Sequence, residues 1–552
     1  MVSSSGVMMV LSSLCVAYGL IYSGLLYLGC GCITSGLFNV KVSTMMVGTN
    51  LEVGGDGWLM VGVVLAVCLV VVVFSGVYMS SDAFYNQFLV ILLFFVFGVV
   101  VLLVSSGFYY LLIGWEVLGL VSFFLIGYYG SRFSWGSAMV TVMVNRVGDV
   151  GMALILLFLL VYGGLFSGGE GVYLSIGLSI TVMFVVITKS SQYPCSGWLP
   201  LAMAAPTPVS ALVHSSTLVI AGLFVGWVLS GSYGVGLKVV GVVIGLVTLM
   251  SSSLSVLWEC DFKKVVALST SIHLAIMLMM GFVVSWVFMS MHMGLHAFFK
   301  SLLFVGVGLL IMLLLHDQDF RGSSSGGVFS AWCGALIVSS LGSLVGLAFF
   351  SGWVTKDCLM EVVMVSDMGW FWFVALFSSL ACSFVYAYKL VCSIFSVTPL
   401  SGLFSSGWDG GYSLLSVLSM GCCLSVAVGC LTGTGLDASF SVSSFDVSEK
   451  LLYYGFGLFV ILFWWLCSPG PVSFGNMLFL QDLLRWSFVA VSCLGAMFVS
   501  VFESVYFISL ERGLSGASYS LGFKGVQALK TFDLWLVMSS LVLGLFLWVA
   551  VV

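Results

Sequence analysis

Charged residues are what this sequence has least of. Asp, Glu, Lys and Arg make up 7% of its 552 residues, whereas 61% of the residues are hydrophobic. A soluble globular protein has about a quarter of its residues charged, so this composition excludes that class. Most of the few charges are placed singly, without the basic clusters that are typical of proteins that bind nucleic acid or anionic lipid.

Motifs of soluble enzymes are absent as well. The sequence contains no phosphate-binding loop, dinucleotide-binding glycine motif, HExxH zinc motif or nucleophile elbow. Its 15 cysteines are scattered, and the only close pairs are Cys30/Cys32 and Cys422/Cys423. Neither pair has the spacing of a zinc or iron–sulfur ligand set, so no metal site is predicted.

Long apolar stretches are what the sequence does contain. They recur from end to end with lengths of roughly 17–28 residues, enough to cross a bilayer core of about 30 Å. They lack the strict alternation of barrel strands, so each is predicted to be a helix. The fold class predicted is an all-α polytopic membrane protein with about 15–16 transmembrane helices. The predicted spans are 7–28, 58–79, 86–105, 108–130, 136–165, 172–204, 208–230, 235–258, 262–285, 286–315, 327–366, 369–396, 411–433, 451–467 and 531–551.

Proline is also scarce, with seven residues in the chain, yet four of them fall within 188–217. Two of the predicted spans are too long for one plain helix, and each has a lysine beside an expected interruption. These are 172–204, broken at 193–197 beside Lys189, and 327–366, broken at 351–355 beside Lys356. Paired broken helices are typical of transporters that are built from two inverted repeats with related sites.

The domain organisation follows from the distribution of spans and charges. The stretch 476–530 is apolar but carries spaced charges. Residues 486–508 could cross the membrane on hydropathy alone, and a long helix lying along the membrane fits the charge spacing about as well. We predict N-terminal helices at 1–105, a transporter-like, proton-translocating core at 106–396, further helices at 397–475, a lateral amphipathic helix at 476–530 and a last span at 531–552.

Ionisable residues inside the spans need a reason, because a charge at the bilayer centre costs at least ~2.5–3.5 kcal/mol. Glu116 is the only charge of its span, and it is either a proton-accepting carboxylate or a carboxyl bonded to a neighbouring helix. Arg146 and Asp149 are three residues apart and can pair on one helix face. Lys189 lies beside a break, where a moving partner would let it take up and release a proton. Snorkelling to the interface is its alternative.

Three ionisable residues repeat every fourth position in one later span. His292, His296 and Lys300 therefore lie on one helix face, which predicts a proton relay through the bundle. The HxxxH spacing could also bind a metal, but no third ligand has a suitable spacing. His214 and His273 occur on neighbouring spans, where each is either a core histidine or a functional one.

The second break has its own group of charges. Lys356 is followed directly by Asp357, which is available as its partner or as an exit group for a proton. Lys263 and Lys264, by contrast, follow Asp261 at the start of a span and are predicted to lie at the membrane surface. A chain with a proton path and no catalytic centre must be driven by an ion gradient or by a partner protein.

Several of these segments together resemble one family closely. They are GWEVLGLVSFFLIGYY at 114–129, NRVGDVG at 145–151, APTPVSALVHSST at 205–217, HMGLHAFFKSLLF at 292–304 and GWVTKD at 352–357. They are similar to NADH–ubiquinone oxidoreductase chain 5, the distal antiporter-like subunit family of respiratory complex I. The resemblance covers about residues 110–360 in register.

The resemblance implies one proton channel in a redox-driven pump of the mitochondrial inner membrane. Its site residues would be Glu116 with Lys189 as the first-half pair, Asp149, His214 as a connecting group, His292, His296 and Lys300 as the central relay, and Lys356 with Asp357 at the exit. Partners would be membrane lipid and the other membrane-arm subunits, notably the adjacent antiporter-like chain, and no nucleic acid. FMN, iron–sulfur clusters and ubiquinone belong to partner subunits, so this chain is expected to bind no cofactor.

Two departures and two alternatives go with this interpretation. His273 stands where the family usually has glutamine, without an assigned role, and Ala348 replaces a proline ahead of the second break. One alternative is a subunit of an Mrp-type sodium/proton antiporter. The other is a structural subunit that conducts no protons, which the cost of keeping charges in mid-membrane disfavours.

Overall fold

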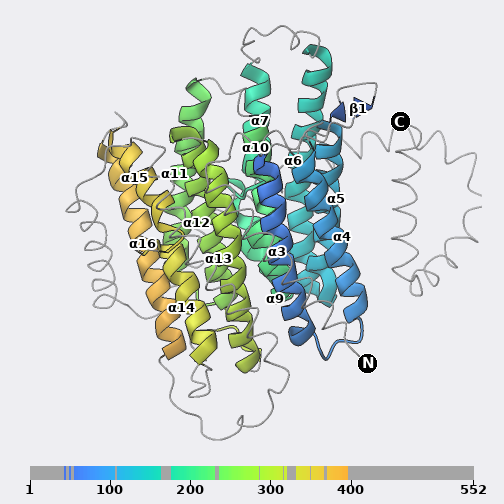
Figure 1. Cartoon of the computed structure of the whole chain (residues 1–552), viewed down its shortest axis with the longest axis vertical. Helices are drawn as coiled ribbons and strands as arrows, with labels where there is room; N and C mark the ends of the chain where they lie inside the picture. The colour runs from blue at the N-terminus through green and yellow to red at the C-terminus, as the bar shows by residue number, and fades with distance from the viewer. Residues whose placement is uncertain are drawn as a thin grey trace, which may run out of the picture. The chain divides into compact units, whose positions relative to one another are not determined.

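The computed structural model describes eleven stretches of the chain, all within the compact unit Met1–Leu480. They are residues 43–44, 49–50, 55–105, 108–162, 176–229, 235–284, 286–314, 316–319, 331–347, 350–365 and 370–395. Helices lying side by side make up this part of the chain (Figure 1). Its strands are limited to β1 (Ser43–Thr44) and β2 (Thr49–Asn50), which pair antiparallel. The predicted all-α class is confirmed.

The long helices agree closely with the predicted spans. They are α3 (Gly55–Tyr78), α4 (Tyr85–Val104), α5 (Phe108–Ile126), α6 (Arg132–Tyr162), α7 (Ile176–Lys189), α10 (Leu218–Val228), α11 (Val235–Trp258), α12 (Phe262–Val283), α13 (Trp286–Leu313), α14 (Ala331–Val345), α15 (Trp353–Val365) and α16 (Trp370–Phe395). Eight stretches of the described residues are long and apolar enough to cross a membrane. The predicted spans 7–28, 411–433, 451–467 and 531–551, and the lateral helix 476–530, lie outside the described residues.

Burial separates central helices from peripheral ones. Within their apolar windows, 94% of the residues of α12 and 89% of those of α13 are buried, against 33% for α6. Helix α13 packs against α12, α14 and α3 (Figure 1). A helix that is hydrophobic on all sides can occupy this interior position. His273 of α12 and the ionisable residues of α13 are therefore enclosed by protein rather than by lipid.

The first helix interruption begins directly after Lys189, where α7 ends. The chain then turns and continues as three short helical pieces, η3 (Cys195–Gly197), α8 (Trp198–Leu201) and η4 (Ala202–Ala204). The predicted break at 193–197 was placed too late, because residues 195–197 already have helical turns. Indole Nε1 of Trp198 donates to the carbonyl oxygen of Thr188 at 3.1 Å and so satisfies a carbonyl that the interruption frees.

A wide helical turn follows this interruption. After α9 (Thr207–Val209), residues Ser210–Thr217 form the π-helix η5, which leads into α10. In π-geometry some carbonyl groups lose their usual backbone partners, and side-chain hydroxyl groups donate hydrogen bonds to them instead. The Thr217 hydroxyl donates to the carbonyl oxygen of Leu212 at 2.8 Å. π-Turns occur often at functional sites, and His214 lies within this one.

The second interruption covers residues 346–352, between α14 and α15. The predicted position of 351–355 was again late, since α15 already begins at Trp353. Gly346 has a φ of +82°, a left-handed conformation that favours glycine. A Cβ atom added to Gly352 would lie 2.0 Å from the Ser343 carbonyl oxygen, so only glycine lets the two half-helices approach this closely. Ala348 lies outside the described residues.

Candidate functional site

Lys189 is fully buried at the end of α7. Its Nζ lies 4.5 Å from the ring centroid of Trp115 on α5, a cation–π geometry. Within the part of the chain that the structure describes, no hydrogen-bond partner reaches this Nζ. Glycines provide the space, because a Cβ on Gly119 would lie 3.7 Å from Nζ and one on Gly222 only 3.0 Å from the lysine Cβ. Packing and an aromatic face therefore hold this amine in place.

Two carboxylates, Asp149 and Glu116, belong to the same region. The indole Nε1 of Trp115 donates to Asp149 Oδ1 at 2.7 Å, so the edge of the ring binds Asp149 and its face lies against Lys189. Arg146 Nη1 reaches Asp149 Oδ2 at 3.1 Å and Glu116 Oε2 at 2.7 Å. The predicted pairing of Arg146 with Asp149 is confirmed. Glu116 forms its ion pair with Arg146 and does not contact Lys189, but its charge, like that of Asp149, acts on the Lys189 amine.

His214 occupies the π-helix η5 and is buried. Its ring meets the Trp198 ring edge-on, with the centroids 6.2 Å apart. Among the described residues neither ring nitrogen has a hydrogen-bond partner. Because Trp198 also caps the carbonyl of Thr188, the histidine lies against the half-helix that ends the Lys189 interruption.

The predicted face of α13 is completely buried, as His292, His296 and Lys300 all have no exposed surface. Lys300 Nζ donates to the Ser269 hydroxyl of α12 at 2.6 Å. His292 Nδ1 lies 2.8 Å from the Thr355 hydroxyl of α15. The three residues thus run along α13 between a contact with α12 and a contact at the second interruption.

His273 of α12 joins this face. Its Nδ1 lies 3.2 Å from His292 Nε2, and the two ring planes are 9° apart. Its ring centroid is also 5.3 Å from that of His296. The ring of Phe299 packs edge-on against all three imidazoles. The described residues contain no group of three His, Cys, Asp or Glu side chains arranged to hold a metal ion.

Lys356 lies at the second interruption, buried in the first turn of α15. Its Nζ donates to the carbonyl oxygens of Leu344 at 2.5 Å and Val345 at 3.1 Å. These are the last carbonyls of α14, which carry the negative end of the helix dipole and favour a cation. Asp357 follows it on α15 and is partly exposed.

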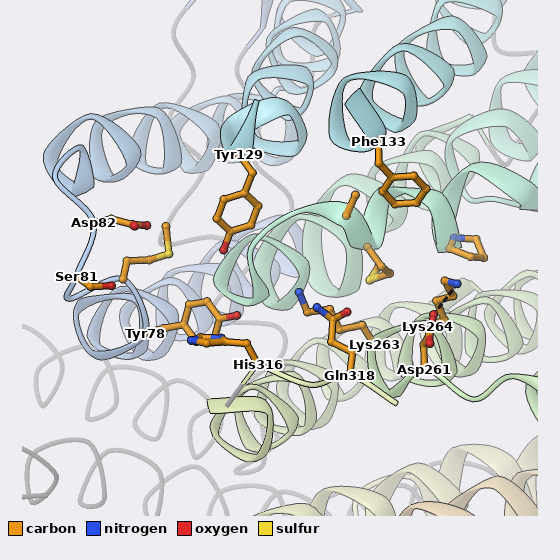
Figure 2. Close-up of a pocket in the computed structure, with 14 residues that line it drawn as sticks. Tyr78, Ser81, Asp82, Tyr129, Phe133, Asp261, Lys263, Lys264, His316 and Gln318 are labelled. Atoms are coloured by element: carbon orange, nitrogen blue, oxygen red, sulfur yellow. Dashed lines mark ion pairs between the residues drawn. The ribbon is translucent and has the colours of Figure 1, made fainter. Parts of the chain in front are cut away.

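A cavity of about 660 Å³ lies next to the end of α3, the starts of α6 and α12, and the short helices α8 and η4 (Figure 2). Tyr78, Tyr129, Lys263 and His316 are among its lining residues. Lys263 lies in the first turn of α12, as predicted for the start of a span, but it is 4% exposed and its Nζ donates to the Ala205 carbonyl oxygen at 3.2 Å. Burial of Lys263 comes from packing of α12 against η4, which a local charge pattern does not reveal.

Lys264, the neighbour of Lys263, behaves as predicted for a surface residue. Its Nζ pairs with Asp261 Oδ2 at 2.5 Å, and both side chains are partly exposed (Figure 2).

The sequence of this chain is similar to known membrane proteins. Residues 105–382 match the family described as NADH:quinone oxidoreductase/Mrp antiporter, transmembrane region. NADH-ubiquinone oxidoreductase chain 5 of Aedes aegypti is 32% identical over 73% of this chain and 75% of its own length. The chain belongs to the NADH-ubiquinone oxidoreductase chain 5 family. The chain 5 protein of Mytilus edulis is 37% identical over 56% of this chain and 55% of its own length.

Solved structures share the fold of this chain 5 family member at low identity. A chain of the Mrp complex from Dietzia sp. DQ12-45-1b aligns with 95% of this chain and 63% of its own, at 17% identity and a TM-score of 0.67. A chain of the membrane-bound sulfane sulfur reductase, an archaeal respiratory complex, aligns with 80% of this chain and 99% of its own, at 15% identity and a TM-score of 0.60. The resemblance stated from sequence motifs is confirmed, and all nine predicted site residues lie within the matched range.

Sequence reasoning did not identify the polar residues that connect the predicted site in this chain 5 protein. Trp115, Ser269 and Thr355 each hydrogen-bond to a predicted residue from a different helix. Tryptophan, serine and threonine are common in apolar spans, so their identity alone carried no signal. His273 was noticed as an unusual residue but received no role.

Glu116→Gln provides a test of the acidic group. The amide keeps the side-chain shape but loses the negative charge that pairs with Arg146, which leaves Arg146 to Asp149 alone. We expect proton translocation to slow severalfold, about tenfold at most, with the complex still assembled. Initial rates of proton uptake in proteoliposomes would measure this. Glu259→Gln is the matched control, because Glu259 is partly buried between α11 and α12 and away from this group; equal rates in both variants would contradict the assignment.

Proposed function

We propose that this chain is a proton-translocating membrane subunit of NADH:ubiquinone oxidoreductase in the mitochondrial inner membrane. Electron transfer from NADH to ubiquinone takes place in other subunits, which hold the FMN and iron–sulfur centres, and this chain binds no cofactor. The membrane-arm subunits, including an adjacent antiporter-like chain, are its partners. The observation that supports this best is a set of buried ionisable groups from Lys300 to Lys356, with no exposed surface on three of them.

The first half of the path centres on Lys189. Lys189 is buried without an ion pair among the described residues, so a small movement of a nearby charge changes the electrostatic environment of its amine. Asp149 and Glu116 are the negative charges of this region, and Arg146 holds both. A shift of α5 or α6 that moves these carboxylates relative to Lys189 would load or unload the amine. The interruption after Lys189 gives the backbone room for such a shift.

The second half of the path uses groups that both donate and accept hydrogen bonds. Ser269 receives a hydrogen bond from Lys300 at one end. Imidazoles of His292 and His296 follow along α13, and an imidazole can accept a proton at one nitrogen and release one at the other. The Thr355 hydroxyl connects His292 to the turn that carries Lys356. Lys356, held by the carbonyls of α14, would release its proton toward Asp357.

Two other functions fit the observations less well. An Mrp-type antiporter subunit has the same fold, as the Dietzia structure indicates. Its sequence identity to this chain is 17%, however, whereas the chain 5 protein of Aedes aegypti is 32% identical. A structural subunit has no need of buried amines. Lys189, Lys300 and Lys356 are each at most 3% exposed. Burying an amine in this way costs free energy that side-chain packing alone does not offset.

The proposed function is tested by Lys356→Met, which keeps the length of the side chain and removes its proton. We expect the complex to assemble and the number of protons translocated per ubiquinone reduced to fall. Lys238→Met is the matched control, because Lys238 is an exposed residue of α11. Proton flux and NADH oxidation would be recorded together in proteoliposomes. A wild-type ratio in Lys356→Met would refute a conducting role.

A further inference from the structure

The histidine of α12 at position 273 is a buried ionisable group that the path above does not use. Its side chain has no exposed surface. The titratable groups around it are Lys356 of α15 and His292, His296 and Lys300 of α13. No other ionisable residue of α12 is near it, since Lys263 and Lys264 lie more than two helical turns away along the helix.

The contact with His292 has the geometry of a hydrogen bond between two imidazoles. The nitrogens are 3.2 Å apart, the planes are 9° apart and the centroids are 5.4 Å apart. That centroid distance is close to the nitrogen separation plus two ring radii, so the bond lies near the ring planes, as a good imidazole hydrogen bond requires. Since His292 Nδ1 is bonded to Thr355, His292 is connected on both sides.

The other nitrogen of His273 points to a second connection. His273 Nε2 and both nitrogens of His296 are buried without a hydrogen-bond partner among the described residues. Buried polar atoms of this kind normally bind a protein group or a water molecule. The two rings are 5.3 Å apart between centroids, whereas those of His292 and His296 are 6.4 Å apart. His273 is therefore nearer to each of the two α13 histidines than they are to each other.

We propose that His273 is a proton-carrying residue of the relay, placed between His296 and His292. An N–H bond of His296 breaks as its proton forms a new N–H bond at His273 Nε2, and the N–H bond at His273 Nδ1 breaks as that proton passes to His292 Nε2. His292 in turn releases its Nδ1 proton toward the Thr355 hydroxyl. No electron is transferred, and the total number of protons on the His273 ring is unchanged. Phe299 packs edge-on against all three rings and restricts their movement.

This inference rests on the proposed function and is tested by substitutions at position 273 in the intact complex. His273→Phe keeps a flat ring without nitrogen, and His273→Gln keeps a hydrogen bond to His292 without a second basic nitrogen. We expect both to slow proton translocation by roughly tenfold. In His273→Ala, added imidazole should restore most of the rate by occupying the space of the lost ring. His316→Gln is the control, because His316 is exposed.

The outcomes separate a proton carrier from a packing residue. Wild-type translocation in His273→Gln, or a slow His273→Ala that imidazole leaves unchanged, would overturn the proposal. If His273→Phe does not assemble, the glutamine and alanine variants still decide the matter. Lys356→Met is measured in the same preparations. If it translocates normally, the proposed function fails; if only the His273 variants translocate normally, this inference alone fails.

Discussion

Replacing Lys189 by alanine is expected to slow proton translocation coupled to ubiquinone reduction by about tenfold or more. The substitution removes the amine that faces Trp115 and that the charges of Asp149 and Glu116 act on. The side chain is buried without an ion pair in the described structure, so the protein loses no salt bridge. Assembly should therefore persist. Proton flux and ubiquinone reduction would be measured on the purified complex in proteoliposomes.

Lys189→Arg distinguishes a proton carrier from a fixed positive charge. Arginine keeps the charge beside Trp115 but does not release its proton at physiological pH. A carrier role predicts that this variant is as slow as Lys189→Ala. Recovery of translocation in Lys189→Arg would show that only the charge is needed. Lys238→Ala, at an exposed lysine of α11, is the control for the loss of a lysine as such.

Gly352→Ala is expected to damage the second interruption severely. The added methyl group would lie 2.0 Å from the Ser343 carbonyl oxygen, which belongs to backbone and cannot rotate away. Overpacking of a core costs about 1–3 kcal/mol, and a clash with backbone lies at the upper end of that range. Relief of the clash would separate α14 from α15 and weaken the hydrogen bonds of Lys356 to Leu344 and Val345.

The expected result for Gly352→Ala is a lower midpoint of thermal unfolding together with reduced proton translocation. Gly62→Ala is the matched control, because a Cβ atom there would meet nothing within 4 Å and α3 would gain helix propensity. Thermal unfolding of the complex, followed by scanning calorimetry, and proton flux would be compared for both variants. An unchanged midpoint and flux in Gly352→Ala would contradict the close approach of the two half-helices.

Local patterns predicted the helices well and their interruptions less well. Hydropathy located α11 to the residue at both ends, because a lipid-crossing helix needs one long apolar stretch and nothing else. Both interruptions began earlier than predicted, since a helix ends where its carbonyls find other partners. For α7 that partner is Trp198, ten residues beyond Thr188. For α14 it is Lys356, and neither partner can be recognised from the residues at the helix end.

The amino-acid sequence by itself determined that this is an α-helical membrane protein of the chain 5 family with amines beside two broken helices. Hydropathy, helical period and short motifs are local properties, so they can be recognised in the sequence without a three-dimensional structure. Tertiary structure alone decided which groups meet. Glu116 contacts Arg146 across 30 residues, His292 contacts Thr355 across 63, and His273 contacts His292 from another helix. These contacts depend on the rotation and depth of packed helices, which burial of the whole interface determines and no single segment encodes.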